Sequence, residues 1–214
     1  MVKLPNPPAA ADLSRIPPEL RVLEAGTTLW RVYKRGGRHP VLWDTFRSFG
    51  PLGAARFDHH LRPLEGDLVP GAEERAIYYA AAEIATCLAE FFQDTRTISR
   101  DGEEVSLVGF ELAVDLTLLD LTEVWPTQAG ASMALCSGPR SRSRPWSRAV
   151  YEAYPVVQGL YYPSSMHAHL PAVALYERAR AALPPTPIFN RPLSDPALLS
   201  DLERVARHLG YRLV

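Results

Sequence analysis

The alternation of apolar and polar positions predicts short strands separated by amphipathic helices. Apolar, β-branched and aromatic residues favour strands at residues 28–33, 76–80, 105–116, 159–162 and 173–176. Apolar residues recur at helical spacing over residues 83–92, 145–154 and 196–209, which predicts three helices. We expect the segment 105–116 to be a central strand and residues 211–214 to form a last edge strand. Because no repeat or clear linker interrupts the pattern, it predicts one α+β domain.

Two segments fall outside this pattern. Residues 1–26 contain Pro7, Pro8, Pro17 and Pro18, which forbid a long helix. We therefore divide the chain into an N-terminal arm, 1–26, and a domain, 27–214. Residues 43–75 carry few periodic apolar positions and are expected to be a long loop, a kind of segment that is usually functional or mobile.

Composition and charge narrow the class of protein. The chain has 214 residues, 47% of them apolar and 22% charged, which is enough for one substantial core. A net charge of −1 argues against a nucleic-acid-binding protein. Neither a signal-peptide core nor a membrane span of ~20 apolar residues is found, so we expect a soluble, cytoplasmic protein. Cys87 and Cys136 are not in a CxxC pair, and we expect reduced thiols.

Several familiar site motifs are missing. The sequence contains no GxGxxG, Walker A, HExxH or GxSxG motif. His59-His60 and the pair His167 and His169 could be offered as metal ligands. Since no cysteine or carboxylate pattern accompanies them, we expect solvated loop histidines and no metal.

Four charged positions or runs are candidates for binding or chemistry. Arg31 interrupts an apolar strand, and Arg56 lies in the long loop; each could face water or hold an anionic ligand through its bidentate fork. The arginine run within residues 140–148 could be a solvated loop or could hold phosphates. Glu90 closes the helix 83–92, where it could lie on a solvated face or in a site. The residues alone leave these alternatives open.

Taken together, five segments in order resemble the RES domain, a family named for its Arg, Glu and Ser residues. The resemblance covers roughly residues 27–180. The segments are Leu29-Trp30-Arg31-Val32-Tyr33; Ala55-Arg56-Phe57-Asp58; Ala76-Ile77-Tyr78-Tyr79-Ala80 with Thr86-Cys87-Leu88-Ala89-Glu90; Arg144-Pro145-Trp146-Ser147-Arg148-Ala149-Val150 with Gly159-Leu160-Tyr161-Tyr162-Pro163-Ser164-Ser165; and Ala172-Val173-Ala174-Leu175-Tyr176. The chain departs from the family at Asp58, where the family often has Asn, and in the long spacing from Arg31 to Arg56.

The resemblance implies a fold like that of ADP-ribosyltransferases, with a central mixed β-sheet flanked by helices. It implies NAD as the substrate, no metal, and a toxin paired with a DNA-binding antitoxin of the Xre type. The family's catalytic Arg, Glu and Ser correspond to Arg31, Glu90 and Ser164, and its second arginine and its tyrosine to Arg56 and Tyr78.

Simple chemistry is compatible with those roles. Two arginines can hold a pyrophosphate without a glycine-rich loop. Nicotinamide leaves as a neutral ring, so one carboxylate suffices to stabilise an oxocarbenium-like ribose. Tyr78 offers a flat face for stacking, and Ser164 a small donor. Glycohydrolase or phosphorylase activity, mono-ADP-ribosylation of a host protein, and a non-catalytic binding module all stay open, as does a homodimer.

Overall fold

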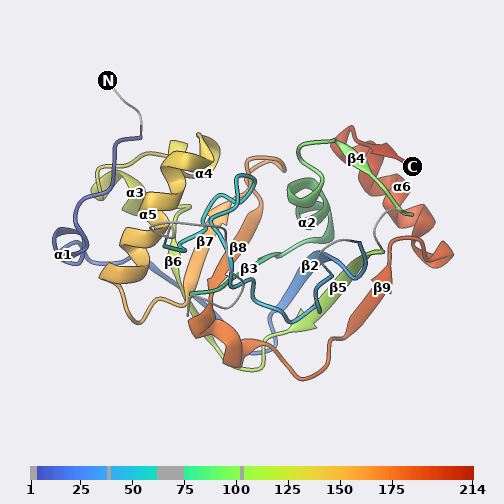
Figure 1. Cartoon of the computed structure of the whole chain (residues 1–214), viewed down its shortest axis with the longest axis horizontal. Coiled ribbons are helices and arrows are strands. Elements are labelled where there is room, and N and C mark those ends of the chain that lie inside the picture. The colour runs from blue at the N-terminus through green and yellow to red at the C-terminus, as the bar shows by residue number, and fades with distance from the viewer. Residues whose placement is uncertain (1–3, 38–39, 62–74, 102–103) are drawn as a thin grey trace.

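An eight-stranded sheet organises the chain in the computed structural model, which describes residues 4–37, 40–61, 75–101 and 104–214 (Figure 1). The strand order is β1-β6-β7-β8-β3-β2-β5-β9. The β6–β7 pair is parallel and the other neighbours are antiparallel, so the sheet is mixed, as predicted. The strands are β1 Leu20–Leu23, β2 Thr28–Lys34, β3 Ile77–Ala81, β5 Val105–Glu111, β6 Leu116–Asp120, β7 Gly159–Pro163, β8 Pro171–Tyr176 and β9 Phe189–Pro192.

Short helices and a small second sheet complete the described part of the fold. The helices are α1 Ala10–Leu13, α2 Ile84–Phe91, α3 Trp125–Gln128, α4 Ala134–Ser137, α5 Arg140–Ala153 and α6 Leu199–Leu209, with 3-10 turns at Glu177–Ala182 and Pro196–Leu198. Strand β4, Thr97–Ile98, pairs in parallel with β10, Arg212–Leu213. Among the described residues, the helices are all too short or too polar to cross a membrane.

The main sheet is buried on both faces. Successive side chains of a strand point to opposite faces, and the buried residues accordingly form two clusters. The first cluster contains Val32 of β2 and Leu88 of α2, together with Trp146 of α5. The second contains Leu29 of β2 and Tyr78 of β3, with alanines of the turn Glu177–Ala182. Helices α2 and α5 therefore share one face of the sheet, as Figure 1 shows.

The predicted elements are largely confirmed, with one strand corrected. The segment 105–116 is two strands rather than one, because β5 pairs with β2 whereas β6 pairs with β1 and β7. Between them, Asp115 accepts a hydrogen bond from the backbone N–H of Ala25 at 2.8 Å, which holds the turn. The predicted helix 145–154 starts earlier, at Arg140, so the arginine run is helical and not a loop.

Both ends of the chain contribute to the fold. The arm 1–26 supplies β1, an edge strand of the main sheet. Trp146 donates its indole N–H to the carbonyl of Pro5 at 2.9 Å, and the Tyr154 hydroxyl donates to the carbonyl of Leu13 at 2.8 Å. The predicted strand at 211–214 is present as β10, but it joins β4 and not the edge of the main sheet.

The predicted loop 43–75 is confirmed where the structure describes it. Within residues 43–61, the regular pairing is one bridge between Arg47 and Ile77 of β3, whose backbone hydrogen bonds are 2.9 and 3.0 Å long. Residues 62–74 lie outside the described residues. The bridge ties the loop to the start of β3.

Candidate active site

A cavity of about 300 Å³ lies on the sheet face that carries α2. Its apolar wall includes Val32 of β2 and Phe91 of α2, and its size is within the usual range for small-molecule sites. Its polar lining comes from the loop before β3, from β3 itself, from the end of α2, from the start of α5 and from β7. These polar residues are Arg47, Arg56, Tyr79, Glu90, Gln93, Asp94, Arg140 and Tyr162.

Glu90 lines this cavity and contacts Ser164, which lies behind it outside the lining, although 74 positions separate the two residues in the chain. Glu90 is in the last turn of α2, and Ser164 directly follows β7. The fully buried Ser164 hydroxyl donates to Glu90 Oε1 at 2.5 Å and accepts from the backbone N–H groups of Met166 and His167, each at 3.1 Å. A hydroxyl that is held by two N–H groups and donates to a carboxylate fixes that carboxylate's orientation.

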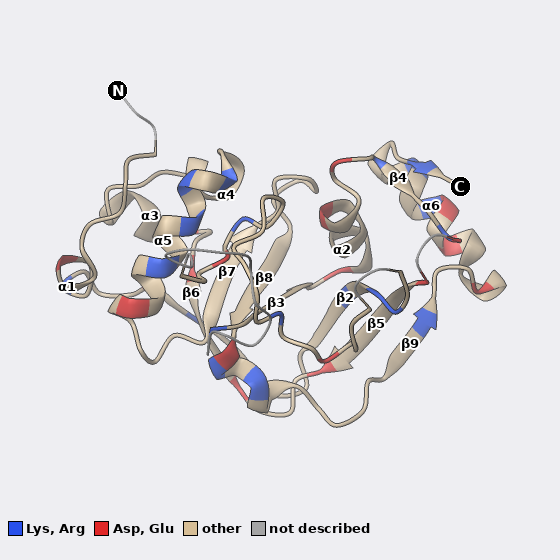
Figure 2. Cartoon of the chain, viewed as in Figure 1, with Lys and Arg blue, Asp and Glu red and all other residues tan. Residues whose placement is uncertain are grey.

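Two arginines bring positive charge beside Glu90. Arg56 donates through Nη1 to the carbonyl of Gly138 at 2.5 Å. Its burial lowers its pKa, Glu90 opposes that shift, and Arg140 adds to it. Arg140 donates through Nη2 to the Gln93 side chain at 2.5 Å and lies 3.4 Å from Asp94. Figure 2 shows that basic residues recur along α5, which begins at this cavity.

A third arginine, Arg47, was not singled out from the sequence. Its Nη2 lies 2.6 Å from Oδ1 of Asp58, a carboxylate with no exposed surface. Asp58 also accepts from the backbone N–H of Leu52 at 2.7 Å and from the Tyr79 hydroxyl at 3.0 Å. Burial and the neighbouring Asp58 raise the pKa of Tyr79 well above its ordinary value, so its hydroxyl stays a donor. Arg47 lies in no recognisable short motif, whereas Asp58 ends the segment Ala55-Arg56-Phe57-Asp58 that the sequence analysis singled out.

The predicted site residues Arg31 and Tyr78 do not line this cavity. The Arg31 guanidinium lies over the Tyr78 ring, 4.0 Å from its centroid, and donates to the carbonyl of Thr45 at 3.0 Å. Burial raises the pKa of Tyr78 to about 12. Their neighbours Val32 and Tyr79 do line the cavity. The geometry of the cavity therefore lends no support to the roles implied for Arg31 and Tyr78, which stay predictions.

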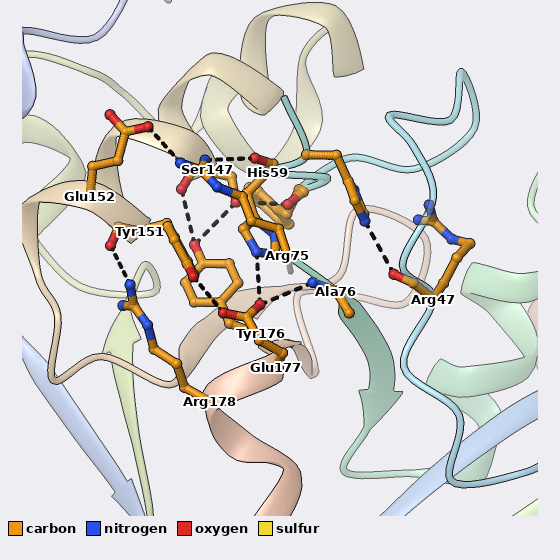
Figure 3. A network of polar contacts seen from close by, with 12 residues as sticks. Arg47, His59, Arg75, Ala76, Ser147, Tyr151, Glu152, Tyr176, Glu177 and Arg178 are labelled. Carbon is orange, nitrogen blue, oxygen red and sulfur yellow. Dashed lines mark hydrogen bonds and ion pairs between the residues drawn. The ribbon is translucent and has the colours of Figure 1, made fainter. Parts of the chain in front are cut away.

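A polar network joins the loop residue His59 to α5, to β3 and to the turn Glu177–Ala182 (Figure 3). Glu177 accepts from the Tyr151 hydroxyl at 2.5 Å, from the backbone N–H of Ala76 at 3.0 Å and from His59 at 3.2 Å. Burial lowers the pKa of His59 to about 4, so at neutral pH its contact with Glu177 is a hydrogen bond from a neutral imidazole. Hydrogen bonds from His59 and Tyr151 outweigh the opposing effect of burial and lower the pKa of Glu177 to about 2.

The prediction of solvated histidines was wrong for His59, His60 and His167, which are buried, whereas His169 is exposed. In the loop before β3, His59 contacts the Glu177 carboxylate, and Nε2 of His60 lies 3.1 Å from the carbonyl oxygen of Arg47. Within the ranges that the structure covers, no three histidine, cysteine, aspartate or glutamate side chains cluster as metal ligands. Cys87 and Cys136 are free, and burial raises the pKa of each thiol to about 12, so they stay protonated.

The arrangement joins one oriented carboxylate to several fixed cations. Glu90 can stabilise a developing positive charge, while Arg56 and Arg140 can hold an anionic part of the same ligand. Such a cavity suits a substrate that combines phosphates with a centre that becomes cationic during reaction.

Comparisons with known proteins bear on the family and the fold. The family model described as "RES domain" matches residues 28–194. A chain from the crystal structure of the M. tuberculosis MbcT–MbcA toxin–antitoxin complex has a similar fold, with a TM-score of 0.53 and 19% sequence identity. The match covers 86% of this chain and 92% of that chain. No curated protein sequence matches significantly.

Proposed function

This chain belongs to the RES domain family, and on that premise we propose that it is a toxin that cleaves the nicotinamide–ribose bond of NAD. The acceptor would be water, for a glycohydrolase, or phosphate, for a phosphorylase. The observation that carries the proposal is that Glu90, oriented by Ser164 at 2.5 Å, lines the same cavity as Arg56 and Arg140.

The position of Glu90 favours a chemical role over a stabilising one. The C-terminal end of a helix carries partial negative charge, so a carboxylate in the last turn of α2 is electrostatically disfavoured there. The same negative field favours a carboxylate that faces a developing cation. Glu90 would stabilise the oxocarbenium-like ribose as the bond to nicotinamide breaks, and Ser164 would keep its carboxylate oriented.

The leaving group needs no acid. Nicotinamide is cationic while it is attached to ribose, and it leaves with the bonding electron pair as a neutral ring. A second carboxylate, as in ordinary glycosidases, is therefore not required. Arg56 and Arg140 would hold the pyrophosphate of NAD through charge-assisted hydrogen bonds.

The purified chain tests this proposal directly. Incubation with NAD should release nicotinamide, and the second product separates the acceptors: ADP-ribose without phosphate, or a phosphorylated ADP-ribose when phosphate is present. A transferase would instead attach ADP-ribose to a protein. No nicotinamide release by the folded protein under any of these conditions would refute the enzymatic proposal and favour a binding module.

The partner is also part of the proposal. The similar solved structure is a toxin–antitoxin complex, and we expect an antitoxin of the Xre type that silences this chain. If the antitoxin covers the cavity, its affinity should fall as NAD is added, because binding at one site excludes the other. Expression of the chain alone in a bacterium should stop growth and lower cellular NAD. Normal growth with unchanged NAD at confirmed expression would contradict the toxin assignment.

A further inference from the structure

Arg47 lines the cavity and forms an ion pair with Asp58, whose carboxylate is fully buried. Its side chain is 15% exposed, whereas that of Asp58 is 0% exposed. An arginine carries five N–H donors. The contacts to Asp58 and to the carbonyl of Phe49 engage one N–H group on each terminal nitrogen, which leaves further donors for a ligand in the cavity that Arg47 lines.

We propose that Arg47 binds a phosphoryl group in this cavity and that Asp58 is the residue that positions it. The inference deepens the proposed function and rests on it for the identity of the substrate. A guanidinium recognises phosphoryl oxygens through paired N–H donors, and this recognition depends on the plane of the fork being fixed. Asp58 fixes that plane by a contact of 2.6 Å.

Asp58 is itself immobilised by groups other than Arg47. The backbone N–H of Leu52 and the hydroxyl of Tyr79 both donate to its two oxygens. Leu52 and Tyr79 also line the cavity, so the carboxylate ties three parts of the wall together.

The loop also leaves space for this pair at Gly50. A Cβ atom added at Gly50 would lie 2.7 Å from Nδ1 of His60, 2.9 Å from Nη1 of Arg47 and 3.0 Å from Oδ2 of Asp58. Only glycine lacks that atom, so the close approach of the loop to the Arg47–Asp58 pair depends on Gly50.

Arg47 forms a positive position separate from that of Arg56 and Arg140. Arg47 pairs with Asp58, whereas Arg56 donates to the carbonyl of Gly138 and Arg140 to the side chain of Gln93. The phosphoryl group could belong to NAD itself or be a free phosphate that attacks the ribose. In the second case a phosphate oxygen forms the new bond to the ribose carbon as the bond to nicotinamide breaks, and nicotinamide leaves with the electron pair.

The experiment measures binding by the full chain with two probes, ADP-ribose and inorganic phosphate, by isothermal titration calorimetry. The variant Arg47→Gln should weaken binding of at least one probe roughly tenfold to a hundredfold, which is the scale of one charge-assisted hydrogen bond. Loss confined to ADP-ribose assigns Arg47 to the substrate's own phosphates, and loss confined to phosphate assigns it to the acceptor. Unchanged affinity for both probes would overturn the inference.

Further variants separate binding from folding. Because Arg47→Gln leaves Asp58 buried without its partner, the double variant Arg47→Gln, Asp58→Asn removes both charges and should show the same loss of affinity. The matched control is Arg21→Gln, which breaks another ion pair to a buried carboxylate, Asp120, at 2.9 Å but outside the cavity. It should leave both affinities unchanged; equal losses in the control and in Arg47→Gln would also overturn the inference.

The role of Asp58 is tested through kinetics. Asp58→Asn keeps Arg47 but loosens its fork, so the KM for NAD or for phosphate should rise at least several-fold while kcat changes less. A merely structural role would lower the amount of folded protein and leave KM unchanged. If the parent releases no nicotinamide yet binds inorganic phosphate through Arg47, the proposed function fails and the phosphoryl site stands.

Discussion

Acid should destabilise this protein through His59, beginning below about pH 6.5 and so before carboxylates titrate. The imidazole has no exposed surface, and burial lowers its pKa from 6.5 to about 4. In the unfolded chain His59 recovers its ordinary pKa, so between these two values the unfolded state binds the proton more readily. The free energy of unfolding must therefore fall as the pH falls from about 6.5 towards about 4.

The shift sets the magnitude of this effect. A difference of about 2.5 pKa units corresponds to about 3 kcal/mol at full protonation, because each unit is worth 1.36 kcal/mol. At pH 5, where the folded protein still holds His59 neutral, the loss is about 2 kcal/mol. Glu177 has a lowered pKa of about 2, so its contribution is lost only below its ordinary value of 4.5.

Urea unfolding followed by tryptophan fluorescence at pH 7.5, 6 and 5 measures this dependence. The variant His59→Gln can still donate to Glu177 but does not titrate, so its free energy of unfolding should change by about 2 kcal/mol less than the parent's over this range. His169→Gln, which changes an exposed histidine, is the matched control and should behave like the parent. Parallel pH dependences for the parent and His59→Gln would show that His59 is not buried in its neutral form.

Four further substitutions test the site. Glu90→Gln should keep NAD affinity within a few fold and lower the rate of nicotinamide release by roughly 10²–10⁴-fold, the scale of one positioned catalytic group. A rate close to that of the parent would show that Glu90 is not the catalytic carboxylate. Ser164→Ala leaves two backbone N–H groups without an acceptor and removes the hydrogen bond to Glu90. Both the melting temperature and kcat should therefore fall, and an unchanged kcat would show that Ser164 does not orient Glu90. Arg56→Ala should weaken NAD binding tenfold or more, whereas Arg31→Ala should change it only a few fold, because Arg31 lies outside the cavity. If binding isotherms show the larger loss of NAD affinity for Arg31→Ala, they would favour the role that the family resemblance implies for Arg31.

The sequence predicted the elements that bring Glu90 and Ser164 into one site, because hydrophobic periodicity locates strands and helices well. It could not choose between Tyr78 and Tyr79, since neighbouring residues of a strand face opposite sides and both faces of this sheet are buried. The pairing of Arg47 with Asp58 was beyond reach for another reason. Their contact depends on the path of a loop, and loop paths leave no periodic signal.

The order of strands in the sheet has a consequence for how the protein is made. Strand β1 pairs with β6, with Leu20 opposite Leu119, and β3 pairs with β8, with Tyr78 opposite Leu175. The cavity wall likewise runs from Val32 to Tyr162. Pairings between such distant segments form slowly, because the intervening chain must first be ordered. During synthesis on the ribosome, β1 and β3 therefore remain unpaired until β6 and β8 have been synthesised. The nascent chain cannot form the cavity, and so cannot act on a substrate, until most of it has been synthesised.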